Sequence, residues 1–148
     1  METTWSSYMN NAQLPGQKFE LCEGEMLRMH GYVVHVRGRI SIVEGHGYLT
    51  TRRFVFCRKP RLPFGTIFGQ LFRGRKIVFA FPLEDLISIT HEKHGLGRKH
   101  VFRLRNTAEH SVQFGQRRDA WLLAFGAAIR QIRPGIAPRQ RKEFIEFA

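Results

Sequence analysis

Strand-like runs follow one another at close spacing from Met26 to Phe114, and some of them show the two-residue alternation typical of half-buried strands. Residues 32–37 show it first, and six further runs rich in aromatic and β-branched residues follow at close spacing. The expected strands after the first are 40–43, 47–56, 76–81, 86–90, 101–104 and 111–114. Turn-forming residues separate several of them, with turns expected at Glu44–Gly47, Gly95–Gly97 and Asn106–Thr107.

Residues 118–132 change to a helical period. Trp121, Phe125, Ala128, Ile129 and Ile132 fall on one stripe of the predicted helix. An acid at its start complements the helix dipole, and a Pro-Gly pair at 134–135 ends it. The pattern predicts a mainly β fold, a sandwich or open barrel of about seven strands with this helix plugging the open end.

The chain is strongly basic. Its 148 residues include 24 Lys and Arg against 12 Asp and Glu, a net charge of +12. This length suits one domain, and this charge favours an anionic partner, whether acidic lipid headgroups, an acidic protein face or nucleic acid. The first residues do not form a signal peptide and no apolar run reaches membrane-spanning length, so we expect a cytoplasmic protein.

Several short motifs resemble those of one known family, in the same order. Leu21–Glu25, Gly47–Phe56 and Phe81–Leu86 resemble the Gly-Glu opening, the Leu-Thr-x-x-Arg-hydrophobic-x-Phe strand and the Ile-Pro-Leu-x-Asp-Ile step of GRAM domains. The resemblance continues at Gly95–Gly97, at Gln113-Phe114 and at Asp119–Trp121, and covers about residues 21 to 132.

This resemblance implies a pleckstrin-homology-like (PH-like) fold, a bent seven-stranded barrel capped by a C-terminal helix. GRAM domains commonly act as lipid-binding or protein-binding modules, several with a preference for phosphoinositides or phosphatidylserine. The matching residues are mostly scaffold. We therefore expect Arg52 and Arg53 to be structural, with a carboxylate partner such as Glu84 or Asp85.

The chain is expected to comprise a flexible N-terminal arm (1–20), a GRAM/PH-like domain (21–132) and a basic C-terminal tail (133–148). Phe144, Ile145 and Phe147 give the tail enough apolar surface for a short docking segment. Within the domain, residues 58–76 form a basic-aromatic insertion, because most relatives cross this gap in fewer residues.

The insertion combines an apolar stripe with flanking cations and contains no acid. Its apolar residues share the spacing of one helical face and would be membrane or partner anchors: Phe64, Ile67, Phe68, Leu71 and Phe72. Its cations would contact phosphates or headgroups: Arg58, Lys59, Arg61, Arg73, Arg75 and Lys76, joined by Arg98 and Lys99 if their hairpin lies at the same rim. This pattern suits an interfacial helix, in which each basic side chain contributes about 1 kcal/mol to binding an anionic surface.

Two other interpretations of the insertion stay open. Gly65 and Gly69 weaken an isolated helix by about 1 kcal/mol each. The same apolar face would also serve to pack on the chain's own barrel, or to contact a protein partner or a second copy of the chain.

No catalytic or metal motif is evident. His91–His94 with His100 is the one histidine cluster; it lies on a predicted hairpin without a nearby cysteine, so we expect surface histidines, no metal and no cofactor. No nucleophile elbow or glycine-rich phosphate loop is present. The sequence thus predicts a non-enzymatic module for anionic lipid surfaces, peripheral at the membrane. The alternatives are an adaptor or subunit that binds an acidic protein partner and, third, a nucleic-acid-binding protein using the clusters 73–76, 98–100 and 139–142.

Overall fold

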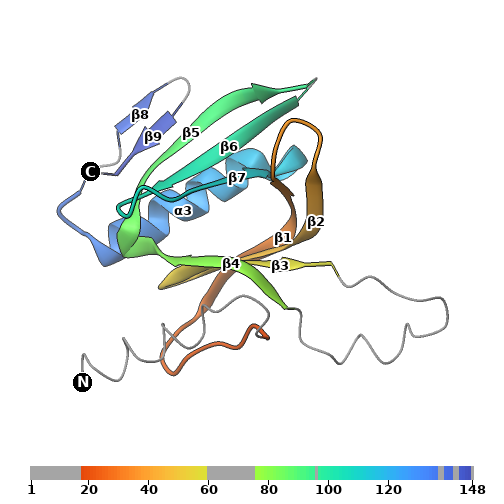
Figure 1. The fold of residues 1–148 in the computed structure, drawn as a ribbon. Helices are drawn as coiled ribbons and strands as arrows, with labels where there is room; N and C mark the ends of the chain where they lie inside the picture. Colours follow the sequence, from red (N-terminus) through yellow and green to blue (C-terminus); the bar gives the residue numbers. More distant parts are fainter. Residues whose placement is uncertain (1–17, 60–75, 96, 137–138, 142–143, 148) are drawn as a thin grey trace.

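The computed structural model describes residues 18–59, 76–95, 97–136, 139–141 and 144–147, and the rest of the chain lies outside the description. In the described residues, one antiparallel sheet of nine strands has the order β4-β3-β2-β1-β7-β6-β5-β9-β8. The strands are β1 Leu27–Val36, β2 Ile42–Thr50, β3 Arg53–Arg58, β4 Ile77–Pro82, β5 Leu86–His94, β6 Gly97–Leu104, β7 Glu109–Gln113, β8 Arg139–Arg141 and β9 Phe144–Glu146. The helical elements are η1 Leu83–Asp85, η2 Gly115–Arg117 and α3 Arg118–Ile132. The sheet bends so that β1–β4 and β5–β7 form two walls, and α3 runs along the opening between them (Figure 1).

The core is built around the ring of Phe54 on β3. Ring centroids of Phe81 on β4, Phe102 on β6 and Phe125 on α3 lie 5.7, 5.3 and 5.3 Å from it. Trp121 meets the same ring edge-on at 6.0 Å. The predicted helix is confirmed over its full range, and four of its five stripe residues are buried in this core.

The predicted strand at 47–56 is wrong in its extent. Gly47–Thr50 ends β2 and Arg53 begins β3, with Thr51 and Arg52 in the turn between them. The expected turn at Glu44–Gly47 is wrong too, because β2 runs straight through it. A Cβ on Gly45 would lie only 2.6 Å from the ring of Phe56. The glycine is there so that β3 can pack closely on β2, and not to turn the chain.

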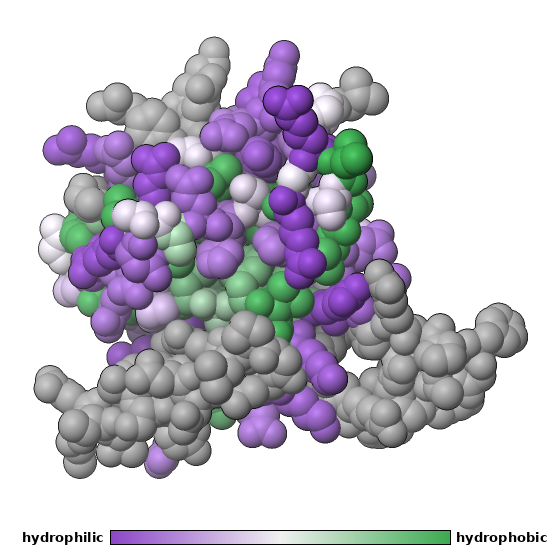
Figure 2. All heavy atoms as spheres, in the orientation of Figure 1, coloured by the Kyte–Doolittle hydropathy of each residue, from purple (hydrophilic) through white to green (hydrophobic). Residues whose placement is uncertain are grey.

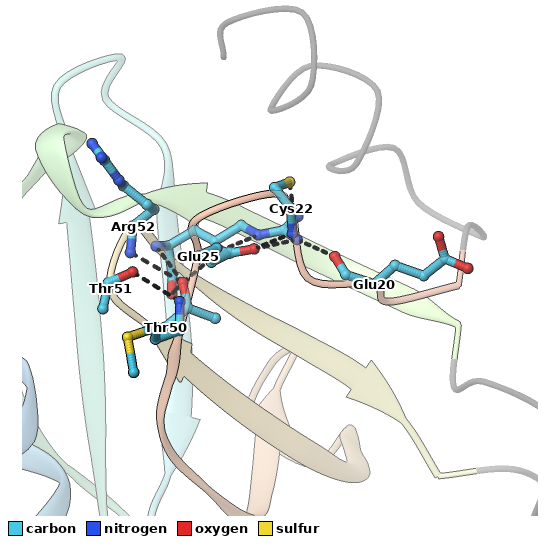
Figure 3. Close-up of polar contacts among 8 residues, drawn as sticks. Glu20, Cys22, Glu25, Thr50, Thr51 and Arg52 are labelled. Carbon is cyan, nitrogen blue, oxygen red and sulfur yellow. Dashed lines mark hydrogen bonds and ion pairs between the residues drawn. The ribbon is translucent and has the colours of Figure 1, made fainter. Parts of the chain in front are cut away.

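Arg53 has the structural role expected, with a different partner (Figure 3). Its side chain is fully buried and forms an ion pair with Glu25, with 2.9 Å between Nε and Oε2. For Arg53 the expected partners, Glu84 and Asp85, are therefore wrong, while for Arg52 they stay a prediction. The hydroxyl of Thr50 accepts hydrogen bonds from the backbone N–H groups of Arg52 and Arg53 at 3.1 and 3.0 Å, which fixes the β2–β3 turn.

The packed structure extends past both predicted domain limits. Phe19 stacks on Tyr48 with ring centroids 4.6 Å apart. At the other end β9 pairs with β5, and Ile145 and Phe147 are buried. The limits at 21 and 132 stay a prediction, while the expected docking of the tail takes the form of a β8–β9 hairpin. In the described part of the chain, no helix combines the length and apolarity that a membrane span needs.

A basic rim with a candidate anion-binding cleft

Several connections gather at one end of the barrel because of the strand register. Val34 near the end of β1 pairs with Glu44 on β2 and with Gln113 at the end of β7. The next residue of β2, Gly45, pairs with Arg58 at the end of β3. The β1–β2 tip, the β5–β6 tip and the start of α3 therefore share one side of the molecule (Figure 1).

Cations dominate this end, which we call the basic rim. Its cations include Arg37, Arg39, Arg58, Lys59, Lys76, Lys93, Arg98, Lys99 and Arg118, and all of these are exposed except Lys99, which is half-buried. Three acids lie among them. Glu44 accepts a hydrogen bond from the Tyr32 hydroxyl at 2.8 Å. The pKa of Tyr32 is raised, mainly by burial and to a smaller extent by this carboxylate. Glu92 and Asp119 pair with Lys99 and Arg118 at 3.7 and 3.4 Å. The rim as a whole is therefore positive and suited to anions.

A cleft of about 480 Å³ lies between the β1–β2 tip and the end of β3, and we call it the Arg58 cleft. It is lined by Arg37, Ser41, Ile42, Val43, Glu44, Arg58 and Lys59. Backbone hydrogen bonds fix its walls: Arg37 N–H donates to the Ser41 carbonyl at 2.9 Å, and Lys59 N–H donates to the Glu44 carbonyl at 3.0 Å. Two guanidinium groups, an ammonium group and a hydroxyl can together hold a phosphate by charge-assisted hydrogen bonds.

An apolar tip stands beside this cleft. Ile40 is 97% exposed and Ile42 is 52% exposed, next to Arg37 and Arg39. Figure 2 shows a strip of hydrophobic surface along the β1–β2 hairpin, bordered by hydrophilic side chains. Exposed apolar side chains among cations suit the boundary between headgroups and acyl chains. The sequence interpretation missed this tip because it assigned Ile40 and Ser41 to a strand at 40–43, which is wrong for these two residues since β2 begins at Ile42. The pair Gly38-Arg39 between the two predicted strands was the signal of a turn.

The predicted cations fall into two groups. Arg58, Lys59 and Lys76 lie together, with the Arg58 N–H donating to the Lys76 carbonyl at 3.2 Å. Arg98 and Lys99 lie on the β5–β6 hairpin at the same rim. The remaining predicted site residues lie outside the described residues: Arg61, Phe64, Ile67, Phe68, Leu71, Phe72, Arg73 and Arg75. Their roles stay a prediction, but the described residues on either side, Lys59 and Lys76, place both ends of their segment on the rim.

The hairpin histidines differ from expectation in one respect. His91 and His100 stack at 5.1 Å, and Arg98 Nη1 lies 2.9 Å from His91 Nε2. His100 is 3% exposed, so the expectation of a surface histidine is wrong for it. Burial lowers the pKa of His100 to about 4, with smaller effects of His91 and Arg118. Across the described ranges, no group of three or more potential metal ligands forms.

The fold resembles solved PH domains. The N-terminal PH domain of Vps36 matches with a TM-score of 0.56 and 13% identity, covering 84% of this chain and 98% of that one. An N-terminally truncated linker-DH/PH fragment of p115-RhoGEF matches with a TM-score of 0.52 and 10% identity, covering 72% of this chain. This chain spans only 30% of that fragment's length. At these identities the likeness establishes a PH-like fold, as expected from the sequence.

No family model matches the sequence, and neither does any curated protein. The GRAM resemblance therefore stays a prediction within the PH-like fold.

Proposed function

We propose that the protein is a non-enzymatic binding module that docks on anionic membrane surfaces through the basic rim. The observation that carries the proposal is the exposed Ile40 at the β1–β2 tip, with Arg37 and Arg39 beside it and the Arg58 cleft adjacent. Each cation near an anionic bilayer contributes about 1 kcal/mol. Several such cations, together with one isoleucine side chain inserted into the bilayer, suffice for reversible docking.

The finer form of the proposal includes the insertion between β3 and β4. Its cations Arg61, Arg73 and Arg75 would extend the headgroup contacts of Arg58, Lys59 and Lys76. Its apolar residues would enter the bilayer beside Ile40: Phe64, Ile67, Phe68, Leu71 and Phe72. In this proposal the Arg58 cleft holds a phosphoinositide or phosphatidylserine headgroup, as the resemblance to GRAM domains implies, and the protein is peripheral on the cytoplasmic side.

Sedimentation with vesicles of phosphatidylcholine, alone or mixed with phosphatidylserine or a phosphoinositide, tests the proposal over a range of salt. The double variant Arg58→Glu/Lys59→Glu is expected to weaken binding at least about tenfold, because it reverses two rim charges. The matched control is Arg105→Glu/Arg130→Glu. It makes the same change of net charge at exposed positions on the β6–β7 turn and the last turn of α3, at the other end of the barrel.

Absence of binding to every anionic vesicle at low salt would overturn membrane docking and favour an acidic protein partner. If the control variant loses as much vesicle binding as Arg58→Glu/Lys59→Glu, the binding reflects attraction by net charge alone and not docking through the basic rim. Binding to nucleic acid that persists above physiological salt would overturn the membrane proposal and indicate a nucleic-acid-binding protein instead.

A further inference from the structure

A second cleft opens on the basic rim, between the β6–β7 pair and the start of α3. It has a volume of about 350 Å³, and we call it the Arg118 cleft. Its lining residues are Gly97, Arg98, His100, Gln113, Phe114, Gly115 and Arg118, none of which lines the Arg58 cleft. The end of β1 separates the two clefts, because Val34 pairs with Glu44 on one side and with Gln113 on the other.

Two guanidinium groups converge on the Arg118 cleft from different elements, Arg98 from β6 and Arg118 from α3. Arg98 Nη1 lies against the imidazole of His91, which leaves further N–H groups of that guanidinium for a ligand. Arg118 Nε faces Asp119 at 3.4 Å, and this carboxylate is 86% exposed and does not line the cleft. Exposed pairs of this kind are worth little free energy, so an anionic ligand can readily replace the carboxylate.

Neutral donors complete the lining. His100 is 3% exposed, and its Nδ1 has no hydrogen-bond partner. With a pKa of about 4 the ring is neutral near pH 7, so it can donate from one nitrogen while accepting at the other. Gln113 adds a half-buried side-chain amide.

The start of the helix lies at the same place. Gly115 lines the cleft as the first residue of η2, which continues directly into the 15 residues of α3. Neither η2 nor α3 has a side-chain cap at its start. Uncapped backbone N–H groups and the positive end of the helix dipole therefore add to the charge of the two arginines.

We propose that the Arg118 cleft is a binding site for a phosphate monoester. Two arginine forks, a helix start and two neutral donors offer more hydrogen bonds than the two oxygens of a carboxylate can accept, whereas a phosphate monoester offers three terminal oxygens and a charge of up to about −2. The volume is about ten times the roughly 30 Å³ that one water occupies, so the cleft also has room for the group esterified to the phosphate. The phosphate belongs either to a small dissolved molecule or to a lipid headgroup such as that of phosphatidic acid. The inference does not rest on membrane docking through the Arg58 cleft.

Amide NMR spectra of the whole chain, titrated with glycerol 3-phosphate at constant ionic strength, test the site. Saturable shifts are expected at Gly97, His100, Gly115 and Arg118. The double variant Arg98→Gln/Arg118→Gln should raise the dissociation constant at least about tenfold. Arg105→Gln/Arg130→Gln, the charge-matched control, should leave it unchanged. Because all four arginines are exposed, none of these changes should threaten the fold.

Vesicles distinguish the two sources of the phosphate. If vesicles with phosphatidic acid bind better than vesicles with phosphatidylserine at equal surface charge, and Arg98→Gln/Arg118→Gln removes this preference, the source is a lipid. Saturable binding of glycerol 3-phosphate without that preference identifies a dissolved ligand. Shifts that do not saturate, or an unchanged dissociation constant in Arg98→Gln/Arg118→Gln, would overturn the site. That failure is separate from a failure of vesicle docking, which is tested at Arg58 and Lys59.

Discussion

Glu25 and Arg53 form an ion pair in which neither side chain is exposed, across 28 positions of sequence. Each carboxylate oxygen accepts two hydrogen bonds. Oε1 accepts from the Cys22 N–H at 2.9 Å and from Arg53 Nη2 at 3.1 Å, while Oε2 accepts from the Thr50 hydroxyl at 2.6 Å and from Arg53 Nε at 2.9 Å. The pair thereby ties the segment before β1 to the β2–β3 turn, with the hydrogen bonding that a buried charge needs.

Removing one member of this pair should be costly. Glu25→Leu or Arg53→Met alone is expected to lower the free energy of unfolding by about 3–5 kcal/mol, because each leaves an uncompensated buried charge. The double variant should lose much less than the sum of the two, and urea denaturation of all four proteins measures the difference. Arg103→Met is the control, since it breaks an exposed pair with Glu109 and should cost less than about 1 kcal/mol. Strictly additive losses would contradict the coupling.

Two glycine-to-alanine changes should shift the free energy of unfolding in opposite directions. Gly45→Ala places a methyl group against Phe56 and the Cys57 carbonyl, and this overpacking is expected to cost about 1–3 kcal/mol. Gly126→Ala on α3 meets nothing within 4 Å and should stabilise by about 0.5–1 kcal/mol through helix propensity. Thermal unfolding should show a lower melting temperature for Gly45→Ala and a higher one for Gly126→Ala than for the wild type. An unchanged melting temperature in Gly45→Ala would refute the close contact between β2 and β3.

Stability should fall as the pH falls from about 6.5 to about 4. Burial lowers the pKa of His35 and His100 to about 4 each, helped by Arg37 and His110 at the first and by His91 and Arg118 at the second. In this window the unfolded chain binds protons that the folded chain excludes, so the stabilisation is present above pH 6.5 and is lost toward pH 4. For His100 the effect is at most about 3 kcal/mol.

Urea midpoints for the wild type and for His100→Phe, measured across this window in phosphate-free buffer, test the pH dependence. The variant should show a shallower decline, because the packing against Phe114 is kept while the titrating group is gone. Parallel declines would contradict the assignment to His100.

Ile40 should matter to vesicle binding and not to folding. Ile40→Ser is expected to weaken sedimentation with anionic vesicles by about tenfold, the order expected from loss of one buried aliphatic side chain. Leu123→Ser on α3 is the matched control, since this leucine is 73% exposed and does not belong to the rim. Equal binding by the two variants would remove the apolar contact from the docking proposal.

The sequence was most informative where local patterns decide the structure. The range of α3 followed from its period and from the Pro-Gly pair that ends it, and the turns at Gly95 and at Asn106–Thr107 followed from their residue types. Gly45 shows where this reasoning fails, since a glycine needed for close packing looks in sequence like a glycine needed for a turn.

The candidate sites were less predictable because they depend on register. Arg37 and Arg58, or Arg98 and Arg118, become neighbours only through the pairing of several strands. Arg98 and Lys99 lie on the predicted hairpin, and their part in binding stays a prediction, whereas Ser41, Gln113 and Gly115 carried no signal of their own.

The pairing of β9 with β5 has a consequence for association between molecules. Ser88–Thr90 would otherwise present free backbone N–H and C=O groups along a strand edge, the kind of surface on which another chain can add a strand. β9 occupies that edge, so a chain shortened before Arg139 should lose more than the burial of Ile145 and Phe147. It should also begin to pair edge to edge, because the edge strand of the intact sheet is β8, whose three residues begin and end with arginine and make it too short and too charged to recruit another strand.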